Sequence, residues 1–221
     1  MRVLVTGAGR GLGLGFVQHY LRAGATVWAA HRGDPGGLAA LERKRLHLLR
    51  WDVSRDDGPK GVLPPAIDLL INNAGIYGPP KAQQALATVT PQAMLDVFNV
   101  DCVGPLRVVQ ALHARLAPGG VVANISSKMG SSTDNRSGGT YAYRAAKAAL
   151  LVVSRSMAVD LAAREVHVLS LHPGWVATDM TGGRGLIDVQ TSVAGMADVL
   201  RRAREYESGA FVAFDGSLVP Y

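Results

Sequence analysis

Short, continuously apolar stretches recur along the chain and alternate with longer stretches in which apolar residues return every three or four positions. The short stretches predict buried β-strands, and the longer ones predict amphipathic α-helices. Alternation of this kind favours a doubly wound α/β fold, in which helices cover both faces of a parallel sheet. We expect about seven strands, at residues 1–6, 25–30, 46–51, 67–71, 121–125, 166–171 and 211–214.

The helical pattern begins after the first strand, where Phe16, Val17 and Tyr20 have helical spacing. It returns at 91–98, 103–116 and 140–163, with Pro105 as an expected kink or boundary. Between the third and fourth strands, by contrast, Asp56, Asp57 and several glycines and prolines leave little room for a helix. We expect a short or irregular crossover there.

Composition limits the classes of protein to be considered. With 221 residues, 48% of them hydrophobic, and no break in composition, we expect one domain spanning 1–221. Cys102 is the single cysteine, and the first apolar run is too short for a secretory signal, which favours a cytoplasmic protein. No run approaches the roughly 20 apolar residues that cross a bilayer, so membrane insertion is not expected.

The formal net charge is +6, but the arginines are spread along the chain rather than gathered into a stripe with aromatic residues. We therefore do not expect nucleic-acid binding. The remaining explanations are solvated arginine-rich helix faces or a basic pocket for an anionic ligand.

A glycine-rich turn occupies residues 6–13, between the first strand and the first helix. Glycines let the backbone approach a pyrophosphate, and a helix N-terminus offers free N–H groups to it. Leu12 breaks the commonest dinucleotide-binding spacing, but Gly7, Gly11 and Gly13 fit T-G-x-x-x-G-x-G. A flexible turn without a ligand is the alternative for this motif considered alone.

Tyr143 and Lys147 are four residues apart in a predicted helix and therefore share one face. A lysine cation beside a phenol favours the phenolate, so we expect the pKa of Tyr143 to fall and Tyr143 to act as a general acid. Tyr141 lacks such a partner, because Ala145 lies four residues beyond it. A solvated pair on a helix surface is the alternative if nothing else matches.

Several other motifs match as well, and together they resemble the short-chain dehydrogenase/reductase family over nearly the whole chain. The motifs occur in that family's order: Thr6, Gly7, Gly11 and Gly13; Asp52 and Val53; Asn72–Gly75; Asn99; Ile125–Ser127; Tyr143 and Lys147; Pro173 and Gly174. The stretches 134–143 and 214–220 are most similar to the sniffer-type carbonyl reductases and the bacterial C-factor proteins. The resemblance implies a Rossmann fold and a nicotinamide cofactor.

The resemblance also implies a role for each catalytic candidate. Tyr143 would exchange a proton with the carbonyl or alcohol oxygen, and Ser127 would hydrogen-bond the same oxygen. Lys147 would hold the nicotinamide ribose, and Asn99 would support a water-linked proton path to Lys147. The implied cofactor-binding residues are Gly7, Gly9, Arg10, Gly11, Leu12, Gly13, His31, Arg32, Asp52, Val53, Asn73, Ala74, Gly75, Tyr143, Lys147, Pro173, Gly174, Val176 and Thr178. No metal is expected.

Neighbouring residues of a strand point to opposite faces, so only one of Ser126 and Ser127 is expected to face the substrate. Alignment with the family's serine favours Ser127. Tyr143 follows Ser127 by 16 positions, and the segment between them contains a Ser-, Thr-, Asn- and Gly-rich insert, for which we expect a loop at the mouth of the site.

Cofactor choice depends on the end of the second strand. His31 stands where NAD-preferring relatives carry an acidic residue, and Arg32 follows it. Arg10 adds a second guanidinium in the glycine turn, so the two arginines can flank a 2'-phosphate. We therefore expect NADP(H) to be preferred over NAD(H).

These expectations combine into an NADP(H)-dependent oxidoreductase that interconverts a carbonyl compound and its alcohol. The substrate is expected to be small, because 181–188 leaves little chain for a lid. The alternative is an NADP(H)-binding sensor or C-factor-like signalling protein. The resemblance also implies a homodimer or homotetramer packed through helices 103–116 and 140–163.

Overall fold

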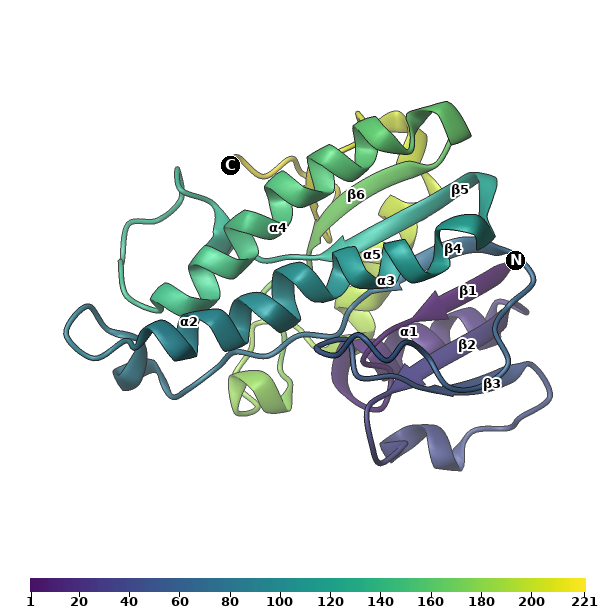
Figure 1. Ribbon diagram of the computed structural model, residues 1–221, viewed down its shortest axis with the longest axis horizontal. Helices are drawn as coiled ribbons and strands as arrows, with labels where there is room; N and C mark the ends of the chain where they lie inside the picture. The colour runs from purple at the N-terminus through teal and green to yellow at the C-terminus, as the bar shows by residue number, and fades with distance from the viewer.

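The computed structural model describes residues 1–221, and a single parallel sheet of seven strands runs through its centre (Figure 1). The strand order is β3-β2-β1-β4-β5-β6-β7, so the order reverses direction between β1 and β4. The strands are β1 (Arg2–Val5), β2 (Thr26–His31), β3 (Leu46–Arg50), β4 (Ile67–Asn72), β5 (Leu116–Ile125), β6 (His167–His172) and β7 (Phe211–Ala213). The predicted doubly wound fold is confirmed, with its ligand-binding crevice expected beyond β1 and β4.

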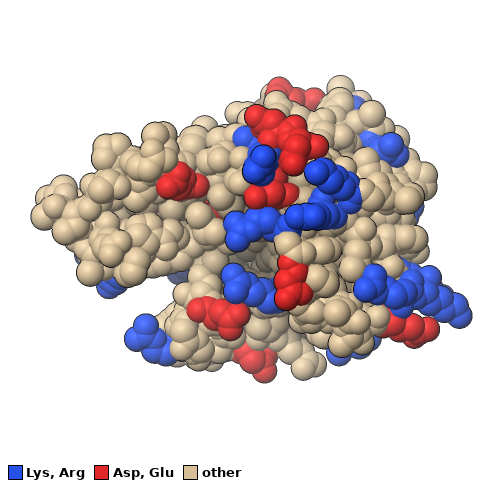
Figure 2. Space-filling view, turned by 60° about the horizontal axis from the view of Figure 1, so that its bottom comes forward, with Lys and Arg blue, Asp and Glu red and all other residues tan.

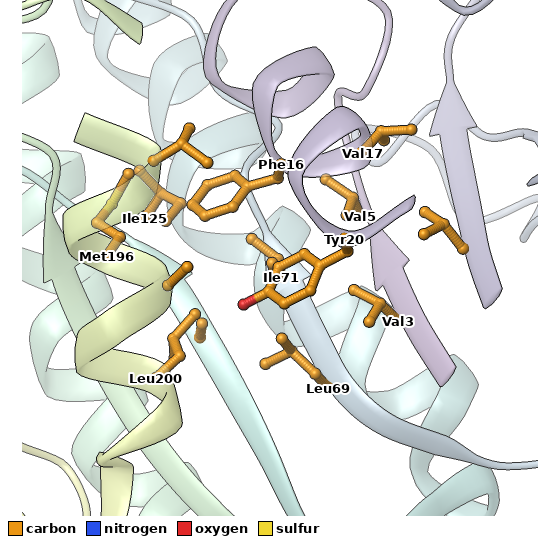
Figure 3. Close-up of a cluster of buried hydrophobic side chains, with 14 of the residues drawn as sticks. Val3, Val5, Phe16, Val17, Tyr20, Leu69, Ile71, Ile125, Met196 and Leu200 are labelled. Atoms are coloured by element: carbon orange, nitrogen blue, oxygen red, sulfur yellow. The ribbon is translucent and has the colours of Figure 1, made fainter. Parts of the chain in front are cut away.

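Two helices, α1 (Gly11–Arg22) and α5 (Val189–Arg201), cover one face of the sheet. Figure 3 shows Phe16 and Tyr20 of α1 directed toward the side chains of the sheet. Met196 of α5 lies next to Ile125 of β5 in the same view. These apolar side chains are buried, which accounts for the spacing that predicted α1.

The other face is covered by α3 (Gly104–Leu112) and α4 (Tyr141–Asp160), while α2 (Pro91–Phe98) extends the line of α3 beyond the sheet and packs beside α4 (Figure 1). Val108 and Leu112 of α3 and Met157 of α4 pack against the buried side chains of this face. Besides the π-helical turn Asn99–Val103, the remaining helices are short 3-10 helices at Gly36–Ala40, Lys81–Gln84, His113–Arg115, Lys128–Gly130, Ala162–Arg164, Asp179–Thr181 and Ala203–Glu205.

The helix predicted over 103–116 differs from the structure. A π-helical turn, Asn99–Val103, joins α2 to α3, and Pro105 lies in the first turn of α3, where its missing N–H is not needed. The chain is already extended at Leu116, because Leu116 pairs with Ile67 of β4. The crossover from β3 to β4 contains no α-helix, as predicted.

A buried chain of polar side chains fixes α4 against the sheet. Asn72 of β4 donates to Asn124 of β5 at 2.8 Å, and Asn124 donates to Ser154 of α4 at 2.8 Å. All three side chains are buried. Because these bonds have no water to replace them, they define the position of α4 over the carboxyl ends of the strands.

No helix of the structure is both long enough and apolar enough to cross a membrane.

Candidate active site

The glycine-rich turn brings three segments of backbone into close contact. Gly7 and Gly11 have positive φ angles of 63° and 52°, which favour glycine. A Cβ atom on Gly13 would lie 2.2 Å from the Gly7 carbonyl oxygen, and one on Gly7 would lie 2.7 Å from the Cα of Ala74. The turn therefore requires glycine at Gly7 and Gly13, and α1 starts at Gly11 with its first N–H groups free to bind an anion.

The remaining residues of the turn differ in exposure. The Gly9 carbonyl accepts a hydrogen bond from the Gly37 N–H, and the Leu12 side chain packs against the core. The Arg10 side chain is 83% exposed, and its Nη1 lies 3.7 Å from a carboxylate oxygen of Asp179. An exposed pair of this length contributes little stability, so Arg10 is available to a ligand.

Asn73 ties the end of β4 to the glycine turn. Its Nδ2 donates to the carbonyl oxygens of Thr6 at 3.0 Å and Gly7 at 3.2 Å. In return, the Thr6 hydroxyl accepts from the N–H groups of Asn73 and Ala74, both at 3.1 Å. These bonds hold the turn where β1 and β4 end.

The candidates for the adenine end lie at the carboxyl ends of β2 and β3. The His31 ring bonds the Gly33 carbonyl at 2.9 Å, and the Arg32 side chain is exposed. Asp52 accepts from the N–H and hydroxyl of Ser54 at 3.0 and 2.7 Å. Burial raises the pKa of Asp52, but these bonds and the nearby Arg32 outweigh it and leave the pKa lowered. No acidic side chain occupies the position of His31.

Tyr143 and Lys147 lie in the first two turns of α4. Tyr143 belongs to an apolar cluster with Val97 of α2, and Lys147 reaches the end of β5. Tyr143 is 9% exposed and Lys147 is 5% exposed. The Lys147 ammonium lies 5.6 Å from the centre of the Tyr143 ring and donates to the Ile125 carbonyl oxygen at 2.9 Å. It also forms an ion pair with Asp101 at 3.1 Å. The solvated pair considered as an alternative is therefore excluded.

The predicted fall in the pKa of Tyr143 is wrong for this structure. Burial, the largest influence, raises the pKa, and the Asp101 carboxylate adds to the rise. Lys147 and the Ser127 hydroxyl act in the opposite direction but do not overcome burial. The pKa of Lys147 is itself raised, because Asp101 and Tyr143 outweigh the lowering effect of burial.

The two adjacent serines occupy different environments. Ser126 is buried, and its hydroxyl donates to the Lys147 carbonyl oxygen at 3.2 Å. The Ser127 hydroxyl accepts from the Met129 N–H at 3.2 Å and lies on the side of Tyr143. Ser127 is thus the serine placed beside the candidate acid.

Asn99, the fourth catalytic candidate, lies elsewhere. Its amide donates to the Ser54 carbonyl oxygen at 3.0 Å and accepts from Arg107 at 3.2 Å. Residues two apart in a helix point in nearly opposite directions, so when Asp101 faces α4, Asn99 faces the β3–β4 crossover. The site therefore contains Asp101, which the sequence analysis missed. Its position in an apolar run was a signal, because a buried acid needs a buried cation.

Val53 and Gly75, two of the predicted cofactor-binding residues, lie next to Arg107 and to the ion pair of Asp101 and Lys147, respectively. Val53 is buried, and its carbonyl oxygen accepts a hydrogen bond from Arg107. A Cβ atom on Gly75 would lie 3.3 Å from an Asp101 carboxylate oxygen and 3.5 Å from the Lys147 ammonium. The absence of a side chain at Gly75 keeps this ion pair open on one side.

The segment after β6 folds over the glycine turn. Gly174 has a φ of 85°, and Val176 is buried after the turn that follows Pro173. The Thr178 methyl lies 3.8 Å from the position of a Cβ on Gly11. This segment therefore reaches across to the start of α1.

The part of this segment from 181 to 188 is compact. Leu186 donates its N–H to the Trp175 carbonyl oxygen at 2.7 Å, and Ala177 donates to the Ile187 carbonyl oxygen at 2.9 Å. These bonds fold the loop back on itself, so it forms no extended lid. Trp175 is 54% exposed and does not cover the core.

A cavity of about 650 Å³ lies between the glycine turn, the loop after β4 and α2, and its walls do not include Tyr143, Lys147 or Ser127. Tyr77 lines it and contacts the Tyr143 ring, with the ring centres 5.2 Å apart. The other walls come from Arg10, Gly75, Ile76, Gly78, Pro79, Thr90, Gln92, Ala93, Asp96, Val97, Asp179 and Met180. No group of three or more His, Cys, Asp or Glu side chains is arranged to hold a metal ion.

Comparisons with known proteins identify the family and the fold. The C-signal protein of Myxococcus xanthus is 41% identical over 157 residues, covering 70% of this chain and 93% of that protein. The structure of an NADPH-bound carbonyl reductase from chicken fatty liver has a TM-score of 0.87 and 32% identity, covering 100% of this chain and 98% of that one. The carbonyl reductase Sniffer of D. melanogaster has a TM-score of 0.88 and 28% identity, covering 100% and 99%.

The model of the family described as short chain dehydrogenase matches residues 1–186. The resemblance inferred from the motifs is confirmed. The chain therefore belongs to the short-chain dehydrogenase/reductase family and is an oxidoreductase of that family.

Proposed function

We propose that this protein interconverts a small carbonyl compound and its alcohol with NADP(H), and that Tyr143 is the general acid and base. The observation that carries the proposal is the pairing of a buried Tyr143 and Lys147 beside Ser127, next to a glycine turn suited to a dinucleotide. Two solved relatives with full-length similarity are carbonyl reductases, which supports this reaction class.

When bound, the nicotinamide cofactor supplies or accepts the hydride. The carbonyl oxygen gains negative charge as hydride adds to the carbon, and the Tyr143 and Ser127 hydroxyls are proposed to donate hydrogen bonds to it. Donors that strengthen as charge develops stabilise the transition state more than the substrate. Lys147 is proposed to orient the cofactor ribose, and Asn73 to support the cofactor site through the glycine turn.

The proposed preference for NADPH rests on charge. His31 carries no carboxylate to repel a phosphate, and the exposed Arg10 and Arg32 lie at the two segments that border the adenine ribose in this fold. The similarity to an NADPH-bound reductase supports the same choice. Asp52 and Val53 are proposed to bind the adenine end.

The test is consumption of NADPH by the purified protein with a panel of aldehydes, ketones and quinones. NADH and the Tyr143→Phe variant are measured in parallel. We expect turnover with NADPH that falls at least about 100-fold in the variant, because a proton donor contributes 10²–10⁴ to the rate. Equal turnover in Tyr143→Phe would reject Tyr143 as the acid.

A sensor or signalling role that depends on NADP(H) occupancy is the second candidate, favoured by the similarity to the C-signal protein. The two candidates differ in their need for a proton donor. Tight NADPH binding that is unchanged in Tyr143→Phe, together with a cell phenotype that the variant rescues, would support the sensor. A phenotype that requires Tyr143 would support the enzyme.

Nucleic-acid binding gains no support from the surface. On the face in Figure 2, acidic side chains lie among the basic ones. Arg155 is paired with Glu207, and Arg202 is paired with Asp198. Salt-dependent binding to DNA is the observation that would support nucleic-acid binding.

We also propose a homodimer or homotetramer in the cytoplasm, packed through the helices on the α3 and α4 face. Val152 and Val159 of α4 are 66% and 65% exposed, and Leu95 of α2 is 62% exposed. Exposed apolar side chains on neighbouring helices suit a contact between copies. Sedimentation that gives only monomer would reject the assembly.

A further inference from the structure

A fully buried carboxylate pairs with the candidate catalytic lysine. Asp101 is 0% exposed, and one of its oxygens accepts the Ile76 N–H at 2.8 Å. The other oxygen accepts no well-aligned hydrogen bond and lies 3.1 Å from the Lys147 ammonium. Burial raises the pKa of Asp101, whereas the Lys147 ammonium and the Ile76 N–H act in the opposite direction. A buried carboxylate without a cation is very unfavourable, so Lys147 is the partner that favours its charged form.

The Asp101 carboxylate therefore offsets much of the electrostatic effect that the Lys147 ammonium would have on the Tyr143 phenol. The ionisable groups that face Tyr143 are Lys147 on the same helix, Asp101 on the π-helical turn and Tyr77 on the loop after β4. Cys102 lies beside Asp101 and Lys147, and burial raises the pKa of its thiol to about 11, so it stays neutral. Asp101 is thus the one negative charge near the phenol.

An unpaired ammonium would favour the phenolate, whereas an ammonium next to a carboxylate exerts a much weaker net field. We propose that Asp101 is a positioning residue that balances Lys147 and keeps Tyr143 protonated, which favours carbonyl reduction over alcohol oxidation near neutral pH. The inference rests on the proposed function, because it assigns Tyr143 as the proton donor.

The balanced step has two parts. A hydride from NADPH forms the C–H bond as the carbonyl π bond breaks, and the resulting alkoxide takes the Tyr143 proton, leaving NADP+ and tyrosinate. Solvent then returns a proton to Tyr143. In the reverse direction, tyrosinate must form before the alcohol is deprotonated, so a protonated Tyr143 slows oxidation.

The experiment follows Tyr143 ionisation by ultraviolet absorbance against pH, as the difference between each protein and the same protein with Tyr143→Phe. We expect Asp101→Asn to move Tyr143 ionisation to lower pH. Alcohol oxidation with NADP+ at neutral pH should then rise about tenfold, the change in phenolate fraction that one pH unit of acidity produces. Asp101→Glu, which keeps the charge, should retain the wild-type titration.

Identical titrations of the wild type and Asp101→Asn would overturn the inference. If Asp101→Asn does not fold, the wild-type titration decides: Tyr143 should ionise above the pH at which an exposed tyrosine does, and ionisation below it rejects the inference. The absorbance readout needs no substrate. A shift in titration without turnover of any carbonyl compound would therefore reject the proposed function while keeping the effect of Asp101 on Tyr143.

Discussion

Gly13 has the tightest backbone contact of the cofactor turn. A Cβ there would lie 2.2 Å from the Gly7 carbonyl and 2.6 Å from the Asn73 amide nitrogen. We expect Gly13→Ala to lower the free energy of unfolding by about 1–3 kcal/mol through overpacking, and to abolish tight NADPH binding. Urea unfolding and NADPH fluorescence titration measure the two effects. Gly33→Ala is the matched control, because nothing lies within 4 Å of its added Cβ, and it should change neither quantity.

Arg32 provides a direct test of cofactor preference. If it binds the 2'-phosphate, Arg32→Ala removes a charge-assisted hydrogen bond of about 1.5–3 kcal/mol and should weaken NADPH binding about tenfold or more. NADH binding should change little. Arg43→Ala removes an exposed arginine elsewhere and serves as the control in the same titrations. An equal loss of affinity for NADPH and NADH would show that Arg32 does not bind the 2'-phosphate.

Sequence alone predicts some residues of this site and not others. The glycines, Tyr143 and Lys147 were predictable because their spacing carries their geometry. Asn99 and Asp101 were not, because their roles depend on the phase of a π-helical turn. The sign of the Tyr143 pKa shift depends on burial and on Asp101, neither of which a two-residue motif contains.

The position of α4 depends on the buried bonds from Asn72 through Asn124 to Ser154. Replacing Asn124 with alanine leaves buried polar groups unpaired on both sides, so we expect a loss of about 2–4 kcal/mol in the free energy of unfolding. Urea denaturation checks this value. Asn135→Ala, in the exposed part of the insert before α4, should lose about 1 kcal/mol or less. Comparable losses in both variants would contradict the role of the buried bonds.

At the scale of elements, short continuous apolar runs located all seven strands, because parallel strands are buried on both faces. Boundaries that depend on tertiary contacts were missed. Leu116 belongs to β5 only because Ile67 pairs with it, and α4 starts at Tyr141 after Thr140 takes a left-handed conformation with φ 53°. The secondary-structure propensities of the residues predict neither the strand pairing of Leu116 nor the left-handed conformation of Thr140.

The whole molecule is a sheet with an apolar cluster on each face, and β6 carries a histidine at the end nearest the site. Nδ1 of His172 accepts the Lys128 N–H at 3.3 Å. Burial and the Lys128 charge lower the pKa of His172 to about 4, although Asp215 and Asp134 oppose them. His172 is therefore neutral in the folded protein at pH 5–7.

This depressed pKa makes folding stability depend on pH. In the unfolded chain, histidine takes up a proton near pH 6.5, whereas folded His172 takes it up only near pH 4. The unfolded state binds more protons between these values, so stability is complete above pH 6.5 and falls as the pH drops toward 4. The loss from this group reaches about 3 kcal/mol at the acid end, by the usual conversion of 1.36 kcal/mol per pH unit.

Urea denaturation of the wild type and of His172→Asn at pH 7.5 and 4.5 measures this contribution. Asparagine keeps an acceptor for the Lys128 N–H but takes up no proton, so the variant should lose less stability on acidification than the wild type. Carboxylates remote from His172 titrate equally in both proteins and cancel in the comparison, whereas Asp215, whose pKa the charged His172 lowers, does not. His113→Asn, at an exposed position, should behave like the wild type. His172→Asn could instead lose as much stability on acidification as the wild type does. In that case His172 does not cause the loss of stability at low pH, and the carboxylate pairs of the surface must account for that loss.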